Sequence, residues 1–104
     1  MPSKPELERA LEDRCVTKVE AAGGLALKLS IPGVRGFPDR GCFLPGAKIF
    51  FIETKRIKSG RISAAQHRWR VLLHQLGFGF YFIETDAQFD TAMKKELSVE
   101  TLPR

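Results

Sequence analysis

The sequence predicts an α/β fold in which helices flank a mixed four-stranded sheet, with the chain order αβββαβα. Two observations favour it: hydrophobic periodicity changes between helical and strand spacing along the chain, and a long helical connection separates the last two strands. The 104 residues, 43% of them hydrophobic, can bury one core. We therefore expect a single domain over residues 1–104, with its core at about 5–85 and a weaker C-terminal helix at about 87–97.

The N-terminal part has the pattern of a helix followed by a strand. Ser3 is a suitable N-cap, and the Gly23-Gly24 pair is a stop. Between them apolar residues recur with helical spacing: Leu7, Ala10, Leu11, Cys15, Val19 and Ala22. Alternation over residues 25–31 then predicts a half-buried strand, with its leucines and Ile31 sharing one face. Residues 32–39, with two glycines and two prolines, should form a turn-rich loop.

The remaining elements follow from turns and apolar runs. Residues 40–44 and 48–54 should be strands joined by a turn at Pro45-Gly46, and the second should be central because its apolar run can be covered on both faces. Ser63 caps a helix that ends at Gly77. Its expected buried stripe is Trp69, Leu72, Leu73 and Leu76. Residues 78–85 form a fourth strand, parallel to the third, and 87–97 form a helix with Phe89, Ala92 and Met93 inward.

Charge is concentrated in the middle of the chain. The net charge is +5, yet residues 21–83 hold ten cationic side chains and only two acidic ones, Asp39 and Glu53, so this segment carries +8. Such a field suits a polyanionic partner, nucleic acid above all, although a solvated basic face would have the same composition.

Other protein classes are excluded by simple patterns. The N-terminus lacks the apolar stretch of a secretory signal, and no apolar run reaches the ~18 residues of a membrane span, so we expect a cytoplasmic protein without membrane contact. Two cysteines, Cys15 and Cys42, are too few for a disulfide framework or a zinc knuckle, and we expect both to be buried as small hydrophobes.

The two central carboxylates have the setting of a metal site. Asp39 begins one strand of the predicted hairpin and Glu53 ends its antiparallel partner, so the two should lie close together. With a strand carbonyl such as that of Thr54 they offer the oxygen ligands of a hard divalent cation. Lys55 shares a strand face with Glu53 and could polarise a water or offset phosphate charge. The alternatives are a carboxylate that caps the turn after Pro38, and a surface ion pair between Glu53 and Lys55.

These residues match a known motif. Pro38-Asp39 followed by Glu53-Thr54-Lys55 resembles the PD-(D/E)XK nuclease motif, with Thr54 where an apolar residue is commoner. Three longer runs resemble the VRR-NUC (virus-type replication-repair nuclease) domain, in its small stand-alone form of phages and bacteria: 30–40, 51–55 and 60–66. The resemblance implies a fold similar to archaeal Holliday-junction resolvases and metal-dependent hydrolysis of phosphodiester bonds in DNA.

The resemblance also assigns roles to residues. Asp39, Glu53 and the Thr54 carbonyl would bind Mg²⁺ or Mn²⁺, Lys55 would position the attacking water, and Gln66 would line the site from the following helix. A further acid from the first helix is expected, Glu12 or, one turn earlier, Glu8. We expect phosphate contacts from the basic residues that flank this site: Lys28, Arg35, Arg40, Lys58 and Arg61. His67 and His74 are two imidazoles without a third ligand, which fits surface or phosphate-contacting residues better than a metal site.

The sequence therefore predicts a Mg²⁺- or Mn²⁺-dependent DNA endonuclease that selects DNA by branch structure rather than by sequence. Paired cuts in a four-way junction need two sites, which a two-fold homodimer supplies. Two other functions remain open: a non-catalytic basic module that binds nucleic acid, and a nuclease of the same fold that acts on RNA.

Overall fold

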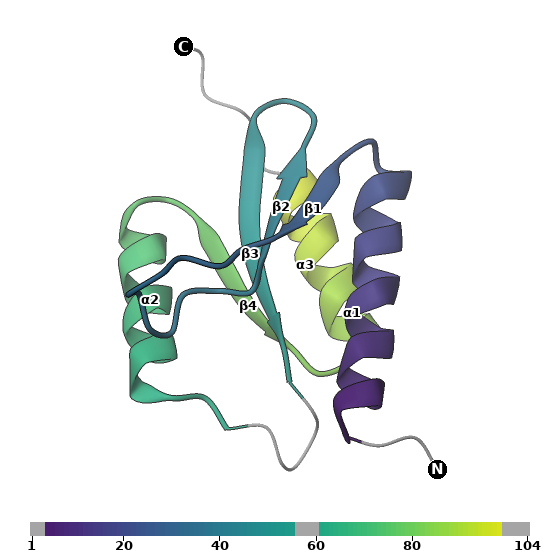
Figure 1. Ribbon diagram of the computed structural model, residues 1–104. Coiled ribbons are helices and arrows are strands. Elements are labelled where there is room, and N and C mark those ends of the chain that lie inside the picture. The colour runs from purple at the N-terminus through teal and green to yellow at the C-terminus, as the bar shows by residue number, and fades with distance from the viewer. Residues whose placement is uncertain (1–3, 56–60, 99–104) are drawn as a thin grey trace.

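The computed structural model describes residues 4–55 and 61–98 (Figure 1). Its elements are, in chain order, α1 (Lys4–Ala21), β1 (Leu25–Lys28), β2 (Arg40–Leu44), β3 (Lys48–Thr54), α2 (Ala64–Gln75), β4 (Gly79–Ile83) and α3 (Asp86–Ser98). The predicted order of helices and strands is confirmed. Strands β2 and β3 have the predicted bounds, because each lies between strong turn signals in the sequence.

The four strands form one mixed sheet in the order β1-β2-β3-β4. The first three run antiparallel, with Arg40 opposite Ile52 across β2 and β3. Strands β3 and β4 are parallel and are connected through α2, as predicted. The antiparallel register places the start of β2 beside the end of β3, which is where the two central carboxylates lie.

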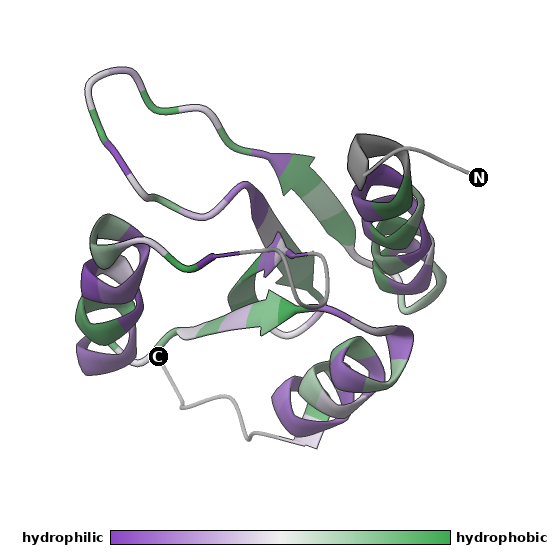
Figure 2. Ribbon diagram, turned by 90° about the horizontal axis from the view of Figure 1, so that it is seen from below, coloured by the Kyte–Doolittle hydropathy of each residue, from purple (hydrophilic) through white to green (hydrophobic). Residues whose placement is uncertain are grey.

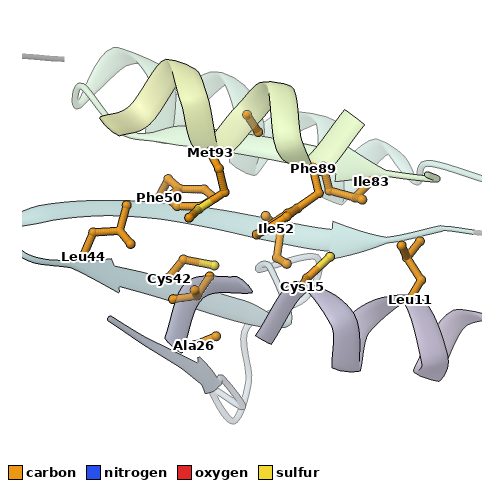
Figure 3. Packing of buried hydrophobic residues seen from close by; sticks show 12 residues of the cluster. Leu11, Cys15, Ala26, Cys42, Leu44, Phe50, Ile52, Ile83, Phe89 and Met93 are labelled. Atoms are coloured by element: carbon orange, nitrogen blue, oxygen red, sulfur yellow. The ribbon is translucent and has the colours of Figure 1, made fainter. Parts of the chain in front are cut away.

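Helices cover both faces of the sheet. Helices α1 and α3 pack on one face and α2 on the other, as the view along the layers in Figure 2 shows. The main core lies between the sheet and the α1/α3 layer (Figure 3). Its fully buried members come from five different elements: Cys15 and Val19, Cys42, Phe50 and Ile52, Ile83, and Phe89. Along β3 the even-numbered residues thus face this core, and the odd-numbered ones, including Glu53, face α2.

Some predicted faces are wrong. In β1 the buried residue is Ala26, whereas Leu25 and Leu27 are 57% and 48% exposed. Helix α1 packs on β1 through the face that carries this small side chain. In α2 only Leu73 of the four predicted stripe residues is buried, because the helix packs chiefly on β4 and leaves Leu72 and Leu76 at the rim.

Other expectations about burial are met. Phe89, Ala92 and Met93 face inward from α3, and Cys15 and Cys42 are free thiols buried in the core. Burial raises the pKa of each thiol to about 12. Within the described part of the chain, no helix is long and apolar enough to cross a membrane.

Candidate functional site

Asp39 is placed by a loop that is anchored on α2. The loop crosses from the end of β1 to α2 before it returns to β2 (Figure 1). Phe37 packs edge-on against Trp69 of α2 and against Phe51 of β3, and the Trp69 indole N–H donates to the Arg35 carbonyl at 3.0 Å. Pro38 is fully buried, and the Asp39 carbonyl accepts from the Leu29 amide at 2.7 Å. Asp39 is exposed to solvent, while the contacts of Phe37, Pro38 and its own carbonyl fix the backbone around it.

Gly36 allows the closest approach of this loop to α2. Its φ of +83° is left-handed, and a Cβ there would lie 2.6 Å from Ala65 atoms and 2.8 Å from the Gln66 nitrogen. Any larger residue would push the loop away from the N-terminus of α2. The sequence shows Gly36 as a turn residue, but its contact with α2 depends on tertiary structure.

Glu53 is buried, and its two carboxylate oxygens have different surroundings. The residue is 7% exposed. Oε2 accepts a hydrogen bond from Gln66 Nε2 at 2.6 Å and lies 3.4 Å from Lys55 Nζ. Oε1 is buried and has no hydrogen-bond partner. A buried oxygen without a partner costs about 1–3 kcal/mol, and more when charged, so this atom has an unused capacity for a ligand.

Gln66 is fixed at both ends of its amide. It is the N3 residue of α2, and its Oε1 accepts from the Ser63 backbone N–H at 2.9 Å while the Ser63 hydroxyl accepts from the Gln66 backbone at 3.1 Å. This capping box leaves Nε2 to donate to Glu53. Predicting the Ser63 cap from sequence was possible, but its effect on the orientation of Gln66 needed the structure.

Burial and a neighbouring carboxylate raise the pKa of both Glu53 and Asp39. Burial raises the pKa of Glu53, and the nearby Asp39 charge raises it further, while Lys55 lowers it. For Asp39, partial desolvation and then the Glu12 charge raise the pKa, against Lys28, Lys55 and Arg40. Both carboxyl groups are therefore easier to protonate than usual, mainly because they are desolvated and secondly because each lies near another carboxylate.

Glu12 lies near this pair, but Arg40 binds it. Arg40 Nε and Nη2 donate to Glu12 Oε2 at 3.1 and 2.9 Å, and Nη1 donates to the Ala26 carbonyl at 3.1 Å. Both side chains are mostly buried, at 17% and 13% exposure. Across residues 4–55 and 61–98, no three His, Cys, Asp or Glu side chains are grouped closely enough to hold a metal ion. The structure thus brings together Asp39, Glu53, Lys55 and Gln66, with Glu12 beside them and facing Arg40.

The predicted phosphate-contacting residues divide into three groups. Lys28, Arg35 and Arg61 are exposed to solvent. Arg40 is not available, since its guanidinium is occupied by Glu12 and Ala26; a sequence pattern cannot show this, because it depends on how α1 packs over β2. Lys58 lies outside the described residues.

The donor set suits a hard divalent cation. Carboxylate oxygens of Asp39 and Glu53, one of them unpartnered, are the ligands that Mg²⁺ and Mn²⁺ prefer. Lys55 and Gln66 already fix the other Glu53 oxygen, so the free oxygen has a defined position. Two carboxylates, an ammonium group and a fixed amide at one sheet edge are the components of a site that hydrolyses phosphate esters.

Known proteins resemble this chain in fold and in sequence. No protein-family model matches it. A solved structure titled "VRR_NUC domain" superimposes with a TM-score of 0.78 and 27% identity, over 85% of this chain and 95% of that one. A curated phage protein, "Putative nuclease p44" of Acyrthosiphon pisum secondary endosymbiont phage 1, is 46% identical over 48 residues. That match spans 46% of this chain and about half, 52%, of the phage protein. Together with the mixed sheet, these similarities support a VRR-NUC domain.

Proposed function

We propose that the protein is a Mg²⁺- or Mn²⁺-dependent endodeoxyribonuclease that hydrolyses phosphodiester bonds at the site formed by Asp39, Glu53 and Lys55. The observation that carries the proposal is the buried, unpartnered Oε1 of Glu53 beside Asp39. A buried carboxylate oxygen without a partner, next to a second carboxylate, destabilises a protein that only binds nucleic acid, whereas a metal-dependent nuclease requires this arrangement.

Asp39, Glu53 and the Thr54 carbonyl would hold the cation. When bound, the cation supplies positive charge that activates water and stabilises the charge on the phosphate. Gln66 keeps Oε2 of Glu53 in place through its hydrogen bond, so that Oε1 stays directed to the ligand position. Lys55, fixed at the end of β3 by the hydrogen bond from its backbone N–H to the Ile83 carbonyl at 2.8 Å, is placed to orient the attacking water and to offset negative charge.

Glu12 has a secondary role in this scheme. Its charge raises the pKa of Asp39, so it belongs to the electrostatic surroundings of the site. We assign it to the outer acid position expected of the first helix, held there by Arg40. Glu8, one turn away, stays the alternative.

Branched DNA is the proposed substrate. One small site offers little surface for reading bases, so shape is the feature that the domain can recognise. Cleavage of a four-way junction needs two opposed cuts, and we propose a two-fold homodimer to supply them. The cytoplasm of a bacterium or of its phage-infected host is the compartment that this activity fits.

The test is a cleavage assay with end-labelled four-way junction, flap, linear duplex and single-stranded DNA. Each substrate is incubated with Mg²⁺, Mn²⁺ or EDTA, using the natural protein, Glu53→Ala and Asp39→Asn, with Glu20→Gln as an exposed control on α1. We expect metal-dependent nicks, paired on the junction, that EDTA and both site substitutions abolish and the control retains. DNA binding without cleavage of any substrate under either metal would leave the non-catalytic module as the function. Cleavage of the same structures made of RNA, but not of DNA, would identify an RNA nuclease.

A further inference from the structure

The two helical layers differ in how their charges are balanced. On the α1/α3 side, Arg14 and Lys18 pair with Asp86, and Lys18 also pairs with Asp90. Helix α2, on the other side of the sheet, contains no acidic residue at all. Arg68 and Arg70 of the basic middle segment thus lie on the α2 side, whereas Arg40 and Lys48 of the same segment contact α1 and α3.

The exposed surface of α2 carries cations that have no acidic partner. We define the α2 basic face as the exposed basic and imidazole side chains of this helix: His67, Arg68, Arg70 and His74. None of them takes part in an ion pair within residues 4–55 and 61–98. Two guanidinium groups without acidic partners, with two imidazoles on the same exposed half of the helix, suit a phosphate-binding surface.

Two members of this face are held in place by an aromatic ring of β4. The Arg70 guanidinium carbon lies 5.6 Å from the centre of the Phe82 ring, and the His67 ring lies 6.1 Å from it. A shallow surface depression runs along the helix between these residues and His74. A guanidinium that rests on a ring keeps its charge and has less conformational entropy to lose when it binds an anion.

The α2 basic face is continuous with the candidate site. His67 directly follows Gln66, whose amide holds the Glu53 carboxylate. Arg61 is exposed just before the helix, and Arg35 lies on the loop that Trp69 ties to α2. A DNA strand that places a phosphate at Glu53 therefore has cations beside it along α2.

We propose that the α2 basic face binds the phosphate backbone of double-stranded DNA next to the bond that is cleaved. This rests on the proposed function, and it adds Arg68, Arg70, His67 and His74 to the DNA-binding residues while it removes Arg40 from them. The only aromatic side chain of α2 other than its imidazoles, Trp69, packs against Phe37 and does not offer a stacking platform. Backbone contact with a duplex thus fits this face better than stacking on single-stranded bases.

The test is the salt dependence of DNA binding without cleavage. Fluorescence anisotropy with a dye-labelled DNA duplex in EDTA compares the natural protein, Arg68→Ala/Arg70→Ala and the matched control Arg9→Ala/Lys94→Ala. The control removes the same charge from exposed residues of α1 and α3, and neither of them has an ion-pair partner in the described ranges. We expect the α2 variant to bind the duplex about tenfold more weakly than the natural protein. The plot of the logarithm of its DNA association constant against the logarithm of salt concentration should be shallower by about 2, while the control changes little. Equal losses in the two variants, or a larger one in the control, would overturn the proposal.

Two further comparisons separate this inference from the proposed function. Arg68→Lys/Arg70→Lys should restore most of the binding, whereas loss of binding in this variant with an unchanged melting temperature would argue against simple phosphate contacts. If the Arg68→Ala/Arg70→Ala protein binds and cleaves DNA like the natural one, the proposed binding of DNA to the α2 basic face is wrong and the nuclease proposal stands. If the natural protein binds DNA through α2 but cleaves no substrate with either metal, the α2 basic face is a DNA-binding surface and the nuclease proposal fails.

Discussion

The asymmetry of the Glu53 carboxylate is the feature that links structure to function at the level of residues. Its Oε2 is bound by Gln66 and Lys55, and its Oε1 is buried without a partner. That Asp39, Glu53 and Lys55 lie together was predictable, because alternation along a strand and hairpin pairing are local rules. The pairing of Arg40 with Glu12 was not predictable, because it depends on where α1 crosses the sheet.

The metal-free protein should lose stability as pH rises through the pKa values of Asp39 and Glu53. Both values are raised above the usual 3.8 and 4.5, so the native state binds protons more tightly than the unfolded state between the usual and the raised values. The free energy of unfolding is therefore higher below this window and falls as pH rises through it. Urea unfolding over a pH series measures this, and Glu53→Gln should flatten the profile, whereas Glu20→Gln should not. A profile that rises with pH across this window would contradict the assignment.

At the level of elements, prediction succeeded where local signals were strong on both sides. Strand β2 lies between the proline-rich loop and the Pro45-Gly46 turn, strand β3 begins after that turn, and the bounds of both were correct. Strand β1 ends earlier than predicted, and its leucines face outward. Alternation defines two faces of a strand but not which one is covered, and here α1 covers the face that carries Ala26.

The N-terminus of α2 should couple helix stability to catalysis. Ser63→Ala removes the N-cap, which should cost about 1 kcal/mol of unfolding free energy, and it also frees the Gln66 amide. The control is Thr85→Ala, which removes the hydrogen bond that the Gln88 backbone N–H donates to the Thr85 hydroxyl at the start of α3. We expect Ser63→Ala to reduce metal-dependent cleavage more than Thr85→Ala does. Ser63→Thr should preserve both properties. Equal cleavage by the two alanine variants would mean that the cap has only a structural role.

Arg40 should act as a bridge between α1 and the sheet. Arg40→Ala leaves a mostly buried Glu12 carboxylate without its partner, which should lower the free energy of unfolding by about 3 kcal/mol. Glu12→Gln in the same protein should recover part of the loss, as a double-mutant cycle in urea would show. If Arg40 were instead a phosphate contact, Arg40→Ala would weaken DNA binding and leave stability unchanged.

Across the whole molecule, Arg14 and Lys18 of the α1/α3 layer form ion pairs, whereas helix α2, beside the site, contains no acidic residue. A nucleic acid bound on the α2 side would contact the cations of α2, Arg35 on the loop before β2, and the carboxylates Asp39 and Glu53. The sequence showed the excess charge, but only the packing of α2 assigned it to a face.

Paired cutting of a junction sets a requirement on the assembly. We expect the protein to sediment as a dimer at the concentrations at which it makes paired nicks, because one copy has one site. Analytical ultracentrifugation beside the junction assay measures this. A protein that is monomeric throughout and still makes paired nicks would contradict the two-fold arrangement.

Binding of Mn²⁺ tests directly, without any substrate, that Asp39 and Glu53 form a divalent-cation site. Isothermal titration at neutral pH compares the natural protein with Asp39→Asn, Glu53→Gln and the control Glu20→Gln. We predict saturable binding by the natural protein and the control, and loss of that binding in both site variants. Equal Mn²⁺ affinity in all four proteins would show that Asp39 and Glu53 do not hold the cation.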